Sequence, residues 1–249
     1  MATLETPKVD RRARIVVTAL VATVAFLFLF PLYWMVVLST HTNADVFRFP
    51  PPLVPGTALV ATWDRLVEAI NLARALWNSL FVAVVHTALV LFLCSFAGYG
   101  FSRFRAAPGS RFLFNMMLVT LFVPPTVGLI PWYILIKELG WVNTFWPLIV
   151  PAAANAFGIF WMRQFVDEAI PVELYEAARV DGASDWWIYA RVVVPLIRPG
   201  LAALAVWTFL STWNNFQIPL IVLNSPEKFT MPLALTNLNA LYRSDTAAV

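Results

Sequence analysis

"PVELYEAARVDGASDWWIYARVVVPLIRPG" occupies residues 171–200 and differs from the chain on either side of it. The flanking sequence is apolar over long runs, whereas this segment carries both acidic and basic side chains. A run of about 20 apolar residues can cross a bilayer as a helix. The segment is therefore a charged, helix-patterned insert between predicted membrane spans. Its charged residues are Glu173, Glu176, Arg179, Asp181, Asp185, Arg191 and Arg198.

Composition places the whole chain among membrane proteins. Of 249 residues, 60% are hydrophobic and 12% are charged, and that charged fraction is about half of the roughly 25% typical of soluble domains. So few charges could not give a soluble protein of this length a solvated surface. We therefore predict an all-α polytopic membrane protein embedded in a lipid bilayer. The net charge of +3 gives no indication of nucleic-acid binding.

Five uncharged runs are long enough to be membrane spans. The first, with 24 residues, makes about 36 Å of helix against a hydrocarbon core of about 30 Å. It is longer than the apolar region of a signal peptide, about 7–15 residues, so we expect it to remain as an anchor. The predicted spans are Ile15–Leu38, Ala75–Ser102, Phe112–Ile136, Leu139–Met162 and Pro199–Pro226.

The distribution of Lys and Arg predicts the orientation. With the N-terminus inside, the inner segments hold eleven of the 17 basic residues, and positive charge accumulates on the cytoplasmic side. Residues 1–14 are then a cytoplasmic tail, residues 40–74 an outer loop, and the charged insert is cytoplasmic. The outer loop is rich in proline and has a predicted short helix, Trp63–Leu72. We expect it to be ordered and to contact a binding protein or a partner permease.

Enzyme motifs are missing from the sequence. It contains no phosphate-binding GxxxxGK[ST] loop, no HExxH and no GxSxG. With only His41 and His86, no histidine metal cluster can form, and we expect no metal or cofactor on this chain. His86 and Cys94 fall within a predicted span. For His86 we expect an interhelical hydrogen bond, with a proton relay as the alternative. For Cys94 we expect simple burial. A secondary transporter and a purely structural membrane partner stay open as other functions.

The charged insert predicts two short helices joined at a glycine. Pro171 and Glu173 suit a first helical turn, Gly182 suits a left-handed end, and Ser184 or Asp185 can cap the second helix. Such an elbow on the cytoplasmic side favours docking into a groove of a soluble partner. A hairpin on the lipid surface would favour a Lys-rich face, but the first helix is net acidic. One face carries mostly small residues: Leu174, Ala177, Ala178 and Asp181.

Several motifs resemble those of one transporter family. The order Glu176-Ala177-Ala178, Gly182, Val192 and Val194-Pro195 is similar to the EAA loop of ABC importer permeases, although that pattern has Ile and Leu where this chain has the two valines. Together the motifs resemble the second, maltose-type permease subunit of carbohydrate uptake ABC transporters. The other similar stretches are DGAS (181–184), NSL (78–80), GYGFSRFR (98–105), VPPTVGLIPWYILIKELGWVNT (123–144) and FLSTWNNFQIPL (209–220).

The resemblance implies a fold and a set of partners. It implies the type I ABC importer permease fold in the inner membrane of a prokaryote. The implied partners are a homologous second permease subunit, two ATPase subunits that bind ATP and Mg, and an extracytoplasmic solute-binding protein. The chain itself would then be a transport subunit and not an enzyme. The implied contacts to the ATPase are Glu176, Ala177, Ala178, Asp181, Gly182 and Pro195.

Family members have six spans, so the sequence predicts five spans of an expected six. We expect one permease domain, 1–249, with a coupling (EAA) loop at 166–198 and an incomplete sixth-span region at 231–249, in which Thr246–Val249 would begin the next helix. The expected outcome is that the chain lacks roughly one span of about 20 residues and its tail.

The substrate is predicted only as a class. Amides and an indole within the fifth span suit sugar hydroxyls, because polar side chains at membrane depth face a cavity or a bundle interior. Interhelical hydrogen bonds are the alternative role, and in the maltose type most sugar contacts come from the partner subunit. A di- or oligosaccharide is expected, with glycerol phosphate or another polyol as the alternative. The candidate path residues are Trp213, Asn214, Asn215 and Gln217.

Overall fold

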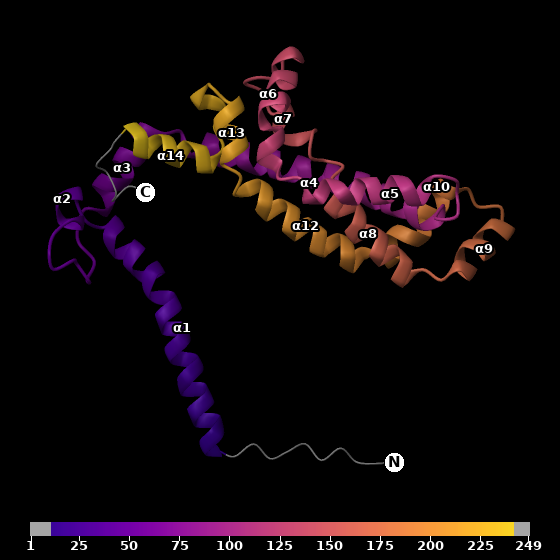
Figure 1. Cartoon of the computed structure of the whole chain (residues 1–249). Coiled ribbons are helices and arrows are strands. Elements are labelled where there is room, and N and C mark those ends of the chain that lie inside the picture. The colour runs from indigo at the N-terminus through magenta and orange to yellow at the C-terminus, as the bar shows by residue number, and fades with distance from the viewer. Residues whose placement is uncertain (1–10, 242–249) are drawn as a thin grey trace. The chain divides into compact units, whose positions relative to one another are not determined.

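The computed structural model describes residues 11–241, apart from the side chains of residues 43 and 238–241, and every regular element in that range is a helix (Figure 1). The α-helices are α1 (Arg11–Ser39), α2 (Asn43–Val46), α3 (Leu59–Ala69), α4 (Leu72–Arg103), α5 (Ser110–Val119), α6 (Leu129–Glu138), α7 (Trp146–Ile149), α8 (Ala156–Ala169), α9 (Val172–Val180), α10 (Asp185–Ile188), α11 (Val194–Leu196), α12 (Arg198–Trp213), α13 (Gln217–Val222) and α14 (Met231–Leu241). Short helices of other types are η1 (Thr120–Phe122), η2 (Pro125–Gly128), η4 (Pro226–Lys228) and the π-helical η3 (Tyr189–Val193).

The described residues form two compact units. The first comprises residues 11–70 and 237–241, and the second comprises residues 71–236. In the first unit, α1 is a long apolar helix whose side chains are almost all exposed, as expected of a helix that faces lipid. The proline-rich segment after it is tied to its end: Tyr33 Oη donates to Leu53 O at 2.6 Å, and Gly56 N donates to Thr40 Oγ1 at 2.7 Å.

The short helix in the outer loop is displaced from its predicted position. It was expected at Trp63–Leu72, but α3 spans Leu59–Ala69. The next helix, α4, begins after Asn71, which caps it with its Oδ1 accepting a hydrogen bond from Arg74 N at 3.0 Å. An asparagine at this position satisfies a backbone N–H that would otherwise lack a partner.

Helix α4 is the centre of the second unit and packs against α8 and α12 (Figure 1). Glycines bring the helices close together. A Cβ on Gly98 would lie 2.7 Å from Arg163 N, and a Cβ on Gly158 would lie 2.7 Å from Cys94 Sγ. Small residues at helix crossings allow this close approach, on which packing within a bilayer depends. Cys94 is fully buried, as predicted.

The later predicted spans are interrupted, which corrects the expectation of continuous helices. Within residues 11–241, length and apolar composition qualify α1 and α4 as single-helix spans. The number of candidate spans rises to four if each of two bent helix pairs is counted as one span, whereas the sequence predicted five. The segment expected at Phe112–Ile136 bends by 95° between η1 and η2. Consecutive prolines at the bend cannot donate backbone hydrogen bonds and disfavour helix before them.

The other two predicted spans are also broken. Leu139–Met162 begins with Gly140 and Asn143 at positive φ, continues in the four-residue α7, and enters α8 only at Ala156. Pro199–Pro226 is interrupted between α12 and α13. An apolar run therefore indicated membrane depth in these places but not an uninterrupted helix.

Hydrogen bonds join the N-terminal end of α4 to distant segments. Asn78 Nδ2 donates to the carbonyls of Glu227 and Phe229 at 2.9 and 3.0 Å, and Ser79 Oγ accepts from Met231 N at 2.7 Å. Farther along α4, His86 Nδ1 lies 2.8 Å from the carbonyl of Ile149 on α7. The expected interhelical hydrogen bond of His86 is thus confirmed.

Replacing Gly98 with valine should separate α4 from α8 and lower stability by about 1–3 kcal/mol, the usual cost of overpacking. Gly100→Val is the matched control, because a Cβ at Gly100 meets no atom within 4 Å. Thermal unfolding of the detergent-solubilised protein measures both variants. A Gly98 variant as stable as the Gly100 variant would show that the close helix contact is not needed.

Candidate functional site

The charged insert folds as the predicted helical elbow. Helix α9 ends at Gly182, whose φ is +79°, and Ala183 N donates to the carbonyl of Ala178 at 3.0 Å. A left-handed residue with such a bond is the common end of a helix, and glycine adopts it without steric cost. Ser184 then caps α10, with its Oγ accepting from Trp187 N at 3.3 Å. Both the glycine turn and the serine cap are confirmed; Pro171 lies just before the first turn of α9.

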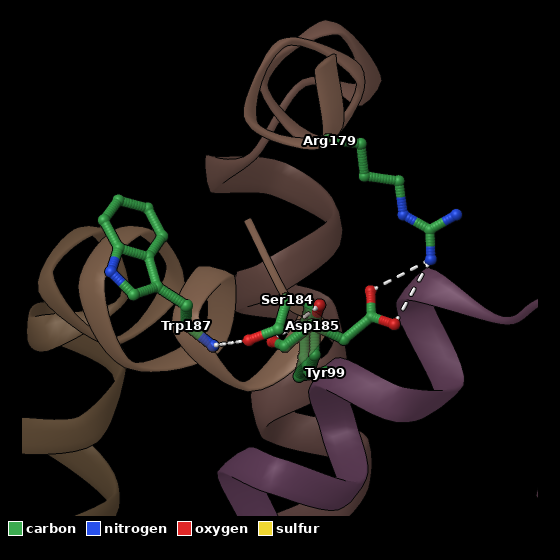
Figure 2. A network of polar contacts seen from close by, with 5 residues as sticks. All are labelled: Tyr99, Arg179, Ser184, Asp185 and Trp187. Carbon is green, nitrogen blue, oxygen red and sulfur yellow. Dashed lines mark hydrogen bonds and ion pairs between the residues drawn. The ribbon is translucent and has the colours of Figure 1, made fainter. Parts of the chain in front are cut away.

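The elbow has two arms, α9 and the segment from Asp185 to Leu196. An ion pair joins them, as Figure 2 shows. Arg179 Nη2 on α9 lies 3.2 Å from each carboxylate oxygen of Asp185 on α10. Both side chains are about half exposed, so the pair contributes roughly 0–1 kcal/mol. Tyr99 Oη of α4 donates to the backbone carbonyl of Asp185 at 3.4 Å. The elbow is thus braced internally and also touches α4.

Tyr175 anchors α9 to the rest of the unit. Its side chain is buried, with its ring centroid 6.1 Å from that of Tyr99 and the Arg103 guanidinium 5.3 Å from its own centroid. Burial raises the pKa of Tyr175 to about 12, so the hydroxyl is neutral at physiological pH. That hydroxyl faces Ser102 but forms no hydrogen bond of standard geometry among the described residues. The anchoring therefore comes from packing of the ring.

The second arm is fixed to α4 by aromatic contacts. Tyr189 stands at the start of the π-helical turn, where its Oη lies 2.7 Å from Ser95 Oγ. Its ring is 5.3 Å from that of Phe96 and 5.6 Å from that of Tyr99. The arm from Asp185 to Leu196 then bends by 78° into α12. Both arms of the elbow thus pack on the C-terminal end of α4.

A groove of about 680 Å³ lies between the two arms, and Tyr175 is not among the residues that line it. The face of small residues predicted from the sequence lines it, so that prediction of a shared face is confirmed. The groove has an apolar rim, since Leu174 and Trp187 are both substantially exposed. Six of its lining residues are Leu174, Ala177, Ala178, Asp181, Gly182 and Trp187.

Two of the predicted contact residues lie outside this groove. Glu176 is exposed on α9 but is not part of the groove lining. Pro195 is partly buried in α11, beyond the π-helical turn. The sequence reasoning did not single out Tyr175 or Trp187. A signal was available for Tyr175, because it is the one aromatic residue on α9 and is off the small-residue face.

Comparison with known proteins identifies the family. Residues 91–249 match the model of the family described as "Binding-protein-dependent transport system inner membrane component". The chain belongs to this family. The permease is 37% identical over 225 residues to the lactose transport system permease protein LacG of Rhizobium radiobacter, which covers 90% of this chain and 81% of that protein.

Other relatives of the permease carry related names. The arabinooligosaccharides transport system permease protein AraQ of Halalkalibacterium halodurans is 32% identical, over 89% of this chain and 80% of that protein. The sn-glycerol-3-phosphate transport system permease protein UgpE of Brucella abortus is 35% identical, over 83% and 75%.

A solved structure supports the fold. A chain from the crystal structure of a bacterial ABC transporter involved in the import of the polysaccharide alginate superimposes with a TM-score of 0.77, covering 98% of this chain and 91% of that one at 24% identity. The resemblance to ABC importer permeases and the type I permease fold are therefore confirmed.

The predicted path residues of the permease meet at the break between α12 and α13. Asn214 Nδ2 donates to Leu210 O within α12, and Asn215 Oδ1 accepts from Ile218 N at 3.2 Å, capping α13. The bonds of both asparagines are thus local and not interhelical. Trp213 stacks on Phe209. Gln217 is exposed and makes no side-chain hydrogen bond among the described residues. The predicted start of a further helix at 246–249 lies outside the described residues.

Truncating the Tyr175 ring should release α9 from α4. Tyr175→Ala removes a buried aromatic ring, a change that costs about 3 kcal/mol or more in a packed site, so hydrogen exchange of the α9 amides should accelerate at least about tenfold. Tyr175→Phe is the control and should exchange like the wild type, because it keeps the ring that packs against Tyr99. Equal exchange in the alanine variant would contradict the anchoring role.

Proposed function

We propose that this permease forms half of the translocation pathway of a binding-protein-dependent sugar importer and receives the ATP-driven movement through the elbow of α9 and α10. The observation that carries the proposal is the groove at Ala177, Ala178 and Gly182, held on α4 by two buried tyrosines. The family membership and the names of the lactose and arabinooligosaccharide relatives support it.

The assembly that we propose contains four kinds of partner. Two ATPase subunits bind ATP and Mg, a homologous permease completes the pathway, and an extracytoplasmic binding protein delivers the solute. The chain itself carries out no hydrolysis. Its N-terminus and the elbow face the cytoplasm in the inner membrane of a prokaryote, in agreement with the excess of Lys and Arg on that side. The outer loop at 40–74 would contact the binding protein or the partner permease.

The coupling mechanism follows from how the elbow is attached. The small side chains let a partner surface approach the α9 backbone closely, while Glu176 offers an exposed charge beside that contact. Tyr175 and Tyr189 transmit a displacement of the elbow to the C-terminal end of α4. Because helices in a packed bundle move as rigid bodies, closure of the ATPase pair would shift α4 together with α8 and α12. That shift would alternate the opening of the pathway between the two faces of the membrane.

The solute path would pass the break between α12 and α13. Interrupted helices place backbone groups and amides at membrane depth, where transporters bind solutes. Gln217 has a free amide for a hydroxyl group, and Trp213 offers a flat apolar surface. From Pro199 to Pro226 the sequence has no Lys or Arg to pair with a phosphate. This favours a neutral sugar over glycerol phosphate, the substrate class in the name of the UgpE relatives.

The transport function is tested by reconstituting the assembled importer in proteoliposomes with its binding protein, whose ligand is first found by a thermal-shift screen of sugars and polyols. Uptake of the labelled ligand should require both ATP and the binding protein. Uptake that proceeds without ATP and follows an ion gradient would instead identify a secondary transporter.

The elbow is tested by reversing a charge and straining the turn. Glu176→Lys and Gly182→Val should each lower solute-stimulated ATP hydrolysis at least about tenfold, because the first removes a contact charge and the second forces valine into a left-handed conformation costing roughly 1–2 kcal/mol. Membrane insertion should be unchanged. Gly140→Val is the control. Gly140 also has a positive φ, and a Cβ added there would meet no atom within 4 Å, but it lies outside the elbow. Full stimulation in the Gly182 variant would refute the coupling role.

A further inference from the structure

The turn between α4 and α5 carries a basic pocket that the transport mechanism does not use. Its volume is about 360 Å³, and three arginines line it: Arg105 on the turn, Arg111 on α5 and Arg163 on α8. Ser110 and Asn115 also line it, and its lining includes no acidic residue. Three guanidinium groups around one small cavity form a site for an anion.

The charges in this pocket are only partly neutralised within the protein. Arg163 lies with its guanidinium 4.0 Å from the Phe114 ring centroid, and its Nε is 3.5 Å from Asp167 Oδ2. Arg105 and Arg111, in contrast, have no ion pair among the described residues. At least two positive charges are therefore available for a ligand from outside the chain.

An apolar pocket adjoins the basic one. It has a volume of about 310 Å³ and shares Phe101 and Ser110 with the basic pocket. The remainder of its wall comes from the end of α4 and the start of α5, including Gly100, Phe104 and Leu113. A cationic pocket therefore continues into an apolar one, at the end of a membrane span.

We propose that these two pockets bind one anionic phospholipid, with the phosphate between the arginines and an acyl chain along the apolar pocket. Basic pockets beside membrane helices bind acidic headgroups, and arginine pairs with phosphate through two parallel hydrogen bonds. A free phosphate would satisfy the arginines but leave the apolar pocket empty, which is why a lipid is the better occupant. In the orientation proposed above, this lipid lies in the cytoplasmic leaflet. The binding itself does not depend on that orientation.

Native mass spectrometry of the assembled transporter in detergent tests the site, with phosphatidylglycerol titrated against phosphatidylethanolamine. The double variant Arg105→Gln/Arg111→Gln should retain phosphatidylglycerol at least about tenfold more weakly, because each arginine near an acidic lipid contributes on the order of a factor of five. Both side chains are exposed, so the fold should tolerate the change. The control is Arg191→Gln/Arg198→Gln, which also removes two positive charges, but from residues that line neither pocket. It should retain the lipid like the wild type.

A second variant separates a lipid from a small anion. Gly100→Leu places a side chain into the apolar pocket from a position where a Cβ meets no atom within 4 Å, and it should weaken lipid retention several-fold with all arginines in place. Undiminished retention in either test variant would overturn the proposal. So would displacement of the lipid by millimolar inorganic phosphate to the same extent in the wild type and the Gly100 variant. None of these measurements depends on ATP hydrolysis or solute uptake.

Discussion

The contact between α4 and α8 is the constraint on which the second unit depends. Within a bilayer, apolar side chains gain little by leaving lipid for protein, so helices associate through close packing and hydrogen bonds. At Gly98 the backbone of α8 occupies the space that a side chain would need. This contact sets the distance at which Met162 and Val166 enter the core, and that core also holds the ring of Tyr175. The elbow keeps its position because the helices beneath it cannot move apart.

A second constraint is that backbone groups at membrane depth need partners. The chain breaks its helices several times, and at three of these breaks an amide side chain supplies a partner for backbone N–H groups. Asn155 accepts a hydrogen bond from Gly158 N at the start of α8, Asn215 does the same for Ile218 N at α13, and Asn143 Oδ1 accepts from Asn224 N and Ser225 N. The interruptions are thus stabilised features, and the one between α12 and α13 leaves room for a second role.

Particular residues show which features of the structure could be predicted from the sequence and which could not. The glycine turn, the serine cap and the small-residue face of α9 could be predicted because each depends on a few neighbouring positions. The hydrogen bond of His86 followed from the cost of a polar group in a span, and the burial of Cys94 followed from its character as a small apolar side chain. The breaks at Asn143 and between η1 and η2 were missed, because hydropathy registers apolar length and not helix direction. Tyr175 was missed as an anchor because its partners, Tyr99 and Arg103, lie more than seventy residues earlier in the sequence.

The way in which the segment from residue 224 to residue 231 is held has a consequence for how transporters of this family diversify. Asn78, Ser79 and Asn143 hold this segment mostly through its main chain: they bind the carbonyls of Glu227 and Phe229 and the amides of Asn224, Ser225 and Met231. Two side chains of the segment add to these bonds, since Ser225 Oγ accepts from Asn143 Nδ2 and Lys228 Nζ donates to the carbonyl of Asn143. Main-chain atoms are the same in every residue but proline. Apart from Ser225 and Lys228, the side chains here can therefore be exchanged during evolution without breaking these bonds, and this surface can adapt to new partners while the helices behind it stay unchanged.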